Sequence, residues 1–127
     1  MKHTKRITYK HKLEEIEAGR VTQTIRKGRN VNVGDTIYFI DIDLEVKVLL
    51  TFPIFCFEDY VEFGYYNTEG EYQYTHHTLW EDEEINNLAE DDGIDPPTGL
   101  ELKKALLELY EMDAFPQDGL AMQIIRW

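Results

Sequence analysis

The chain has few features of a secreted, membrane-bound or disulfide-stabilised protein. It holds a single cysteine, Cys56, among 127 residues, which excludes an internal disulfide framework and fits a reducing compartment. No apolar run approaches the roughly 20 residues that cross a bilayer. The basic start at residues 1–6 is not followed by an apolar stretch of signal-peptide length. The sequence therefore predicts a cytoplasmic protein without a membrane partner.

Metal-ligand spacing is missing as well. His76 and His77 are adjacent, so on a strand they point to opposite faces, and no cysteine or further histidine stands at zinc-ligand distance. An EF-hand loop with its glycine at Gly93 would need acidic residues where the chain has Leu88 and Gly99. We therefore expect neither a metal nor a cofactor.

Repeats, low-complexity tracts and Gly/Ser linkers are also absent, which predicts one domain over residues 1–127. Aromatic residues make up 13% of the chain, and with the many β-branched residues they favour strands over a helical bundle. Apolar patterning predicts strands at residues 6–10, 21–26, 36–40, 45–51 and 120–127, an edge strand within 52–63, and a helix at 12–18. Possible capping boxes at Thr78 and Thr98 predict two more helices, one after Thr78 and one with an apolar stripe over 98–112. The expected fold is α+β: a small mixed β-barrel with two or three flanking helices.

Charge is distributed unevenly along the chain. The net charge is −12, yet residues 1–30 carry nine Lys and Arg against three Glu, and the remainder carries four basic groups against 22 acidic ones. A focused basic patch attracts phosphate even when the rest of a protein is acidic. The alternatives are that the acidic excess serves solubility, or that an acidic face binds a basic protein partner.

The predicted strand at residues 21–26 places polar side chains on one face. Thr22, Thr24 and Arg26 alternate with apolar or amide residues. Arginine forks match phosphate oxygens, so Arg26 is a candidate ligand contact, and Arg20 and Arg29 extend a possible phosphate track. For each arginine a surface salt bridge is the alternative, and for the threonines a structural role in the strand.

Several segments resemble the ASCH domain family. Residues 16–26, IEAGRVTQTIR, resemble the family signature I-x-x-G-[RK]-K-T-x-T-I-R. The Gly-Asp turn in residues 33–37, the acidic segment 89–94, and the LKK and IIRW stretches at 102–104 and 124–127 follow in the family's order. Residues 51–80 match least and are a possible family-specific insertion. The resemblance implies a PUA-like β-barrel that binds RNA or modified nucleosides in a cleft lined by the first motif.

Some bacterial ASCH proteins are acetylcytidine amidohydrolases that use a Lys, a Thr and a Glu. Carried over by position, the Thr falls on Thr24, the Glu on Asp92 and the Lys on Val21. A threonine hydroxyl is a poor nucleophile without a base, and valine cannot supply one. A base displaced to Lys12 or Lys27 is the alternative, and nothing in the sequence selects either.

The sequence therefore favours a binding module for RNA or a nucleotide, with Thr22, Thr24, Arg26 and Asp92 in the cleft and Arg20 and Arg29 on phosphate. The alternative is an amidohydrolase acting on an acylated nucleoside, in which Thr24 and Asp92 are catalytic. In the aromatic segment 64–80, Tyr65 and Tyr66 are the best candidates for stacking on unpaired bases. Packing as core is the alternative for these aromatic rings.

Overall fold

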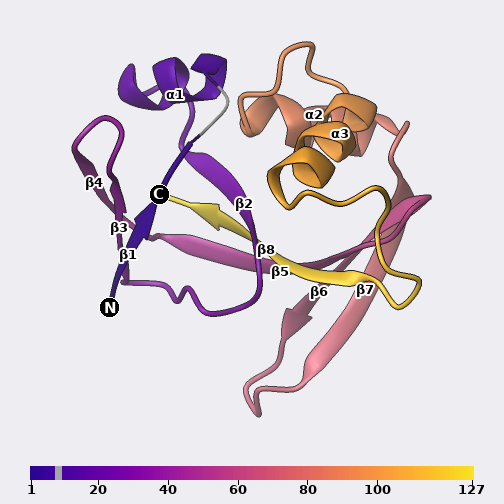
Figure 1. The fold of residues 1–127 in the computed structure, drawn as a ribbon. Coiled ribbons are helices and arrows are strands. Elements are labelled where there is room, and N and C mark those ends of the chain that lie inside the picture. Colours follow the sequence, from indigo (N-terminus) through magenta and orange to yellow (C-terminus); the bar gives the residue numbers. More distant parts are fainter. Residues whose placement is uncertain (8–9) are drawn as a thin grey trace.

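The computed structural model describes residues 1–7 and 10–127. Within these residues the chain forms three helices and eight strands in two sheets, an α+β arrangement. The elements run β1 Lys2–Lys5, α1 Lys10–Glu17, β2 Gln23–Lys27, β3 Thr36–Phe39, β4 Leu44–Lys47, β5 Leu50–Cys56, β6 Tyr60–Tyr66, β7 Tyr72–Leu79, α2 Glu83–Asp91, α3 Gly99–Leu109 and β8 Leu120–Arg126 (Figure 1).

The predicted strand at residues 6–10 includes residues 8 and 9, which lie outside the described part of the chain. The first strand of the described residues is β1, and Lys10 already begins α1.

The expected closed barrel is wrong. The strands form a three-stranded sheet in the order β1-β3-β4 and a five-stranded sheet in the order β2-β8-β5-β6-β7, and the two are not closed into a barrel. The predicted strand at 45–51 is in fact two strands, because the chain leaves the first sheet after Lys47 and enters the second at Leu50. Alternating side chains set the face of a strand but do not name its hydrogen-bonding partner, so the sequence pattern does not reveal this change of sheet.

The segment 52–63 lies at a sheet edge only at its start, because β5 lies between β8 and β6 but pairs with β6 only from Ile54 onward. Pro53 is tolerated there because the pairing of β5 with β6 extends only from Ile54 to Cys56. The missing N–H of the proline therefore interrupts no ladder with β6. The aromatic segment that follows is a long hairpin of β6 and β7, which projects away from the helices (Figure 1).

The helices start as their local sequences require, with one difference from expectation. The Thr98 hydroxyl caps α3 by accepting a hydrogen bond from the Glu101 backbone N–H at 3.2 Å, as predicted. The cap predicted at Thr78 is wrong: Thr78 belongs to β7, its hydroxyl donates to the Asp82 carboxylate at 2.7 Å, and α2 begins after Asp82.

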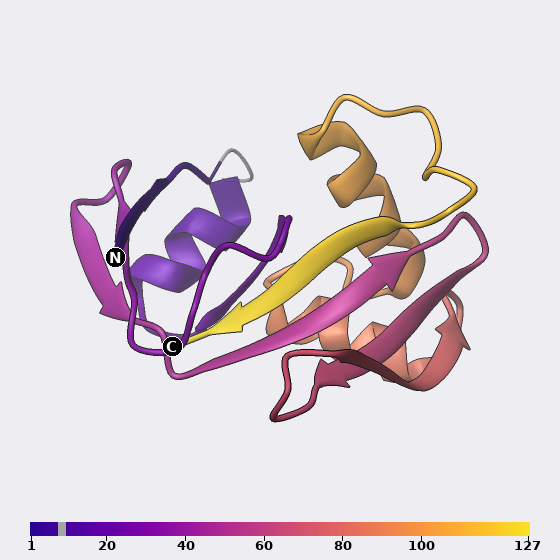
Figure 2. The ribbon, with the colours of Figure 1, turned by 90° about the horizontal axis from the view of Figure 1, so that it is seen from below.

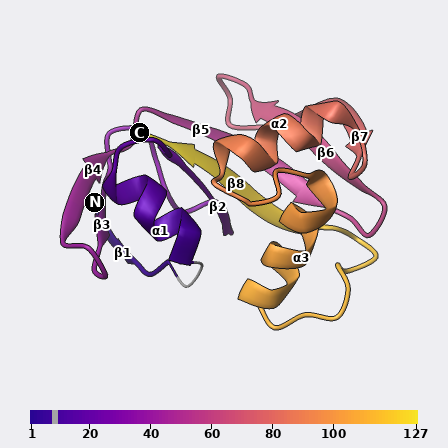
Figure 3. The same ribbon diagram turned by 90° about the horizontal axis from the view of Figure 1, so that it is seen from above.

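Two apolar clusters meet along the end of β8. Helices α2 and α3 pack on the five-stranded sheet, and α1 packs beside the three-stranded sheet (Figures 2 and 3). Ile124 belongs to the first cluster and its neighbour Ile125 to the second, because successive strand residues point to opposite faces. Four buried polar side chains lie together at the seam between α1 and the α2–α3 pair: Lys12, Gln23, Thr24 and Asp92. No helix of the described residues is long and apolar enough to cross a membrane.

A buried polar contact ties β1 to β3. The Asp35 carboxylate accepts a hydrogen bond from the Asn32 backbone N–H at 2.9 Å. The same carboxylate lies 2.9 Å from His3 Nε2. The Asn32 hydrogen bond and then the His3 contact lower the pKa of the Asp35 carboxyl from 3.8 to about 2. Since the pKa in the folded state lies below that of the unfolded chain, this contribution to stability is present above pH 3.8 and lost as the pH falls toward 2.

We expect Asp35→Asn to lower the free energy of unfolding at neutral pH, and the difference from wild type to narrow as the pH falls from about 4 to about 2. Urea unfolding followed at several pH values measures this difference. The matched change at the exposed Asp118 should leave stability nearly unchanged throughout. A difference at Asp35 that stays constant down to pH 2 would contradict the role given to the carboxylate.

Candidate functional site

Strand β2 carries the first residue of the site. It lies at an edge of the five-stranded sheet and pairs with β8, Thr24 opposite Ile125. Threonine is β-branched and suits a strand, and Thr24 is buried with 1% of its surface exposed. Its hydroxyl lines a pocket between α1, β2 and α3.

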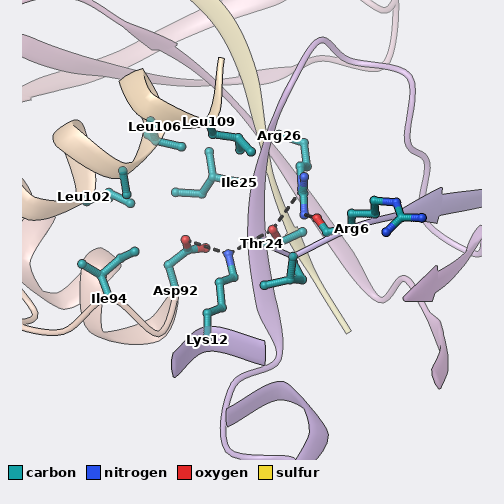
Figure 4. A pocket seen from close by; sticks show the side chains of 12 residues that line it. Arg6, Lys12, Thr24, Ile25, Arg26, Asp92, Ile94, Leu102, Leu106 and Leu109 are labelled. Carbon is teal, nitrogen blue, oxygen red and sulfur yellow. Dashed lines mark hydrogen bonds and ion pairs between the residues drawn. The ribbon is translucent and has the colours of Figure 1, made fainter. Parts of the chain in front are cut away.

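Helix α1 carries the second residue, Lys12. Lys12 and Ile16 are one helical turn apart and share a face, and both are buried. Ile16 packs in the apolar cluster of the three-stranded sheet, which fixes the rotation of α1. Lys12 Nζ consequently reaches the seam, where it donates hydrogen bonds to Thr24 Oγ1 at 3.1 Å and to Asp92 Oδ2 at 2.9 Å (Figure 4).

Asp92 directly follows α2, and Gly93 then turns the chain with a φ of +77°. A Cβ on Gly93 would lie 3.1 Å from Val21 Cγ2 and 3.4 Å from Lys12 Cγ. The turn thus packs closely on the lysine stem, with Val21 beside it. This close approach brings Asp92, 80 residues away in sequence, to the lysine.

Gln23 orients the Asp92 carboxylate. Its side-chain amide oxygen accepts a hydrogen bond from Arg126 Nε at 2.8 Å, so its Nε2 faces the other way and donates to Asp92 Oδ1 at 3.3 Å. One carboxylate oxygen is held by Gln23 and the other by Lys12. The buried carboxylate therefore has partners on both oxygens, as burial of a charge requires.

Burial shifts the pKa values of Lys12 and Asp92 in opposite directions. Burial lowers the pKa of Lys12 from the usual 10.5, and the Asp92 carboxylate opposes this shift. Burial also raises the pKa of Asp92 from the usual 3.8, against the attraction of Lys12. Because burial penalises both charges, the neutral amine is more accessible than in an exposed lysine. Lys12 can therefore act as a base as well as an ammonium ion.

Arg26 supplies a second donor to the same hydroxyl. Its Nε lies 3.2 Å from Thr24 Oγ1, and its Nη2 donates to the Arg6 carbonyl oxygen at 2.8 Å. Burial lowers the pKa of Arg26, but a guanidinium stays protonated in proteins. The Thr24 oxygen thus faces two nitrogen donors, both of which would stabilise negative charge on or beside it.

The pocket around this cluster has a polar and an apolar side. Its cavity is small, about 60 Å³, below the range of roughly 300–1,000 Å³ that small-molecule sites occupy. Arg26 and Arg6 lie on one side of β2, and the apolar side chains of α3 lie on the other, with Thr24, Lys12 and Asp92 between (Figure 4). The remaining lining residues are Ile7, Ile25, Ile94, Leu102, Ala105, Leu106 and Leu109.

Of the residues singled out in the sequence, the structure brings Thr24, Arg26 and Asp92 together in this pocket. Thr22 and Arg20 lie elsewhere, in a separate hollow with Gln23 and Arg126. Arg20 is paired with Glu15, its neighbour across the end of α1.

Arg29 lies in a third place. Its guanidinium donates to the carbonyl oxygens of Ile54 and Met122 and to the Tyr66 hydroxyl. It also stacks over the Phe55 ring at 4.7 Å. These contacts occupy the side chain that the sequence suggested for phosphate. Tyr65 and Tyr66 are half exposed at the hollow beside it, on β6.

Two residues of the cluster had no defined role in the sequence prediction. Lys12 was one of two possible displaced bases, and the signal that selects it is its spacing of four from Ile16, which puts a lysine on the buried face of a short helix. Lys27, the other, does not line the pocket. The role of Gln23 has no sequence signal, because it depends on Arg126 and Asp92.

Within residues 1–7 and 10–127, no group of three or more His, Cys, Asp or Glu side chains is placed to hold a metal ion. The chemistry open to the cluster is that of a hydroxyl, an amine of lowered pKa and a carboxylate. In enzymes, side chains of these types can serve as nucleophile and as proton acceptor or donor.

Comparison with protein-family models, with curated protein sequences and with solved structures found no match to this chain. The resemblance to ASCH domains, and the PUA-like fold it implies, stay predictions from the residues quoted above.

Proposed function

We propose that this chain is an amidohydrolase that removes an acyl group from the exocyclic amine of a modified nucleoside such as acetylcytidine. The observation that carries the proposal is the 3.1 Å contact between Lys12 Nζ and Thr24 Oγ1 inside a pocket. The sequence favoured a binding module because Val21 cannot serve as a base. A lysine that reaches Thr24 from α1 supplies the missing group, so the balance shifts to the enzyme.

The reaction uses the hydroxyl and the amine in turn. Thr24 Oγ1 attacks the amide carbonyl carbon as the neutral Lys12 amine takes the hydroxyl proton. The tetrahedral intermediate collapses, the C–N bond breaks, and Lys12 gives the proton to the departing nucleoside amine. Lys12 then takes a proton from water as the water oxygen attacks the acyl–Thr24 ester. The C–O bond to Thr24 breaks, Lys12 returns the proton to Thr24 Oγ1, and the carboxylic acid leaves.

Arg26 and Asp92 support these steps from opposite sides. Arg26 Nε, 3.2 Å from the attacking oxygen, is placed to donate a hydrogen bond to the developing oxyanion. Asp92 holds the Lys12 ammonium formed after proton transfer, at 2.9 Å. Gln23 keeps the carboxylate turned toward the lysine. Each of these residues acts on charge that appears during the reaction.

A second candidate function is binding of a nucleotide or RNA segment without turnover. The observation that favours it is the pair of arginines, Arg6 and Arg26, at the polar side of the pocket. Arginine is suited to phosphate, and the first 30 residues are basic as a group. Such binding would weaken steeply with salt because phosphate contacts release counterions.

The test is release of acetate from acetylcytidine by the wild type and two variants. We expect Thr24→Val, which keeps the shape but loses the hydroxyl, to reduce turnover by about 10³-fold or more. Thr24→Ser keeps a hydroxyl and should keep measurable turnover. Exposed Thr22→Val in the neighbouring hollow is the matched control and should not change the rate.

Calorimetry with cytidine, acetylcytidine and a short single-stranded RNA separates the two candidates. Turnover that survives Thr24→Val unchanged would reject Thr24 as the nucleophile. Salt-sensitive RNA binding with no acetate release, lost in Arg26→Ala, would support the binding module in place of the enzyme.

A further inference from the structure

The side of the pocket opposite the arginines is built from one face of α3. Leu102, Ala105, Leu106 and Leu109 line it, and their spacing of three and four residues places them on a common face. Leu102 and Leu106 are anchored in the core with 1% and 4% of their surface exposed. Ala105 and Leu109 are only half buried. This apolar wall begins beside the Lys12–Thr24–Asp92 cluster (Figure 4).

The wall continues into a second hollow. Ile94, Ala105 and Leu109 line both hollows. The second is otherwise lined by three carboxylates and one ammonium group, from Asp95, Glu101, Glu108 and Lys104. The two hollows therefore adjoin along α3, and the second has a rim of net negative charge.

An amide bound for attack by Thr24 sends its two substituents in different directions from the carbonyl carbon. The nucleoside carries a polar base and ribose hydroxyls, which suit the side with Arg6 and Arg26. The acyl group carries only carbon and hydrogen beyond its carbonyl, which suits the α3 wall. In the opposite orientation, the polar nucleoside would lie against the apolar wall without hydrogen-bond partners.

We propose that the α3 wall is an acyl-binding subsite that prefers straight acyl chains longer than acetyl and rejects acyl chains ending in a carboxylate. This inference rests on the proposed function, since it assigns the acyl side of the same substrate. Ala105 sets the length that fits, because it lies where the two hollows adjoin and a larger side chain there would occupy the space of an added methylene. Asp95, Glu101 and Glu108 repel a terminal carboxylate at the rim.

The test measures binding apart from turnover, in the Thr24→Val variant, which lacks the nucleophile. Calorimetric affinities are compared for cytidine carrying N4-acetyl, propionyl, butyryl, hexanoyl and succinyl groups. Burial of each added methylene should tighten binding by roughly threefold to fourfold. Succinyl, which ends in a carboxylate, should bind at least about tenfold more weakly than butyryl.

Two changes on the wall should act in opposite directions. Ala105→Leu should remove the gain in affinity between propionyl and butyryl cytidine. Leu109→Ala should extend the gain in affinity to hexanoyl cytidine. Glu108→Lys, at an exposed rim position, should narrow the difference between succinyl and butyryl. A thermal unfolding midpoint close to wild type shows that each variant is folded.

The proposed acyl subsite is rejected if the affinity is equal for all acyl lengths. It is also rejected if Ala105→Leu leaves the length preference unchanged. If the wild type releases the carboxylic acid from all the acylated cytidines at the same rate, the acyl subsite is rejected and the hydrolase is kept. Length-dependent binding with no release of any acid would keep the acyl subsite and reject the hydrolysis. Absence of both binding and release would reject both.

Discussion

Replacing Lys12 by methionine should reduce amide hydrolysis by about 10²- to 10⁴-fold, the usual contribution of a general acid–base group. Methionine fills the space of the lysine stem but offers no proton acceptor. Lys10→Met, at an exposed position of the same helix, is the matched control and should leave the rate unchanged. Wild-type turnover in Lys12→Met would reject the lysine as the base.

The same substitution should also destabilise the fold, because it leaves the Asp92 carboxylate buried without its cation. Breaking a buried ion pair at one partner costs about 3–5 kcal/mol. Burial already raises the pKa of Asp92, and loss of the opposing Lys12 charge raises it further. A carboxyl with a raised pKa is best accommodated when protonated, so Lys12→Met should regain stability as the pH is lowered from 8 to 5. Urea unfolding at these two pH values measures the effect.

The double variant Lys12→Met/Asp92→Asn separates catalysis from stability. It removes both charges, so its stability should return toward that of the wild type while turnover stays lost. Asp92→Asn alone removes the carboxylate that opposes the lowering of the Lys12 pKa. The rising limb of its pH–rate profile should therefore move to lower pH. Recovery of turnover in the double variant would show that Lys12 matters only for folding.

Gly99→Ala should destabilise the protein by about 3 kcal/mol or more. A Cβ on Gly99 would lie 1.8 Å from the Trp80 carbonyl oxygen and 2.7 Å from Ile85 Cγ2. Neither neighbour has room to yield, since Trp80 and Ile85 are buried with 1% or less of their surfaces exposed. The Gly99 N–H also donates to Asn86 Oδ1 at 2.8 Å, which fixes the start of α3 against α2.

Urea denaturation of Gly99→Ala beside Leu100→Ala measures this effect. Leu100 is the next residue and about half exposed, so its truncation should change stability by no more than about 0.5 kcal/mol. Because α3 forms the apolar wall of the pocket, Gly99→Ala should weaken ligand binding as well. A stability within 1 kcal/mol of the wild type would contradict the close packing of α3 on Trp80.

Local patterns in the sequence predicted many of the helices and strands but not how these elements assemble. The alternation at residues 120–127 predicted β8, and the Thr98 cap with the apolar stripe that follows predicted α3. The run at 45–51 predicted one strand where there are two, in different sheets. Residue spacing specifies which face of an element is apolar, whereas the partner of each strand depends on packing across the whole chain.

The candidate site divides in the same way. The resemblance in the sequence pointed to Thr24 and Asp92, and the structure places them in one pocket with Arg26. The face of the predicted strand suggested Thr22, and the basic residues around it suggested Arg20 and Arg29; the structure places all three elsewhere. These residues lie close together in the sequence but outside β2: Arg20 and Thr22 lie between α1 and the strand, and Arg29 follows the strand.

The sequence by itself determined the α+β class, the strand that carries Thr24 and the turn that follows Asp92. Only the tertiary structure decided that Lys12 meets them, because that contact joins α1 to a residue 80 positions away. A lysine side chain has no intrinsic preference for a buried carboxylate over water. It is held there because Ile16 fixes the rotation of α1 in one apolar cluster while α2 and α3 are fixed in the other.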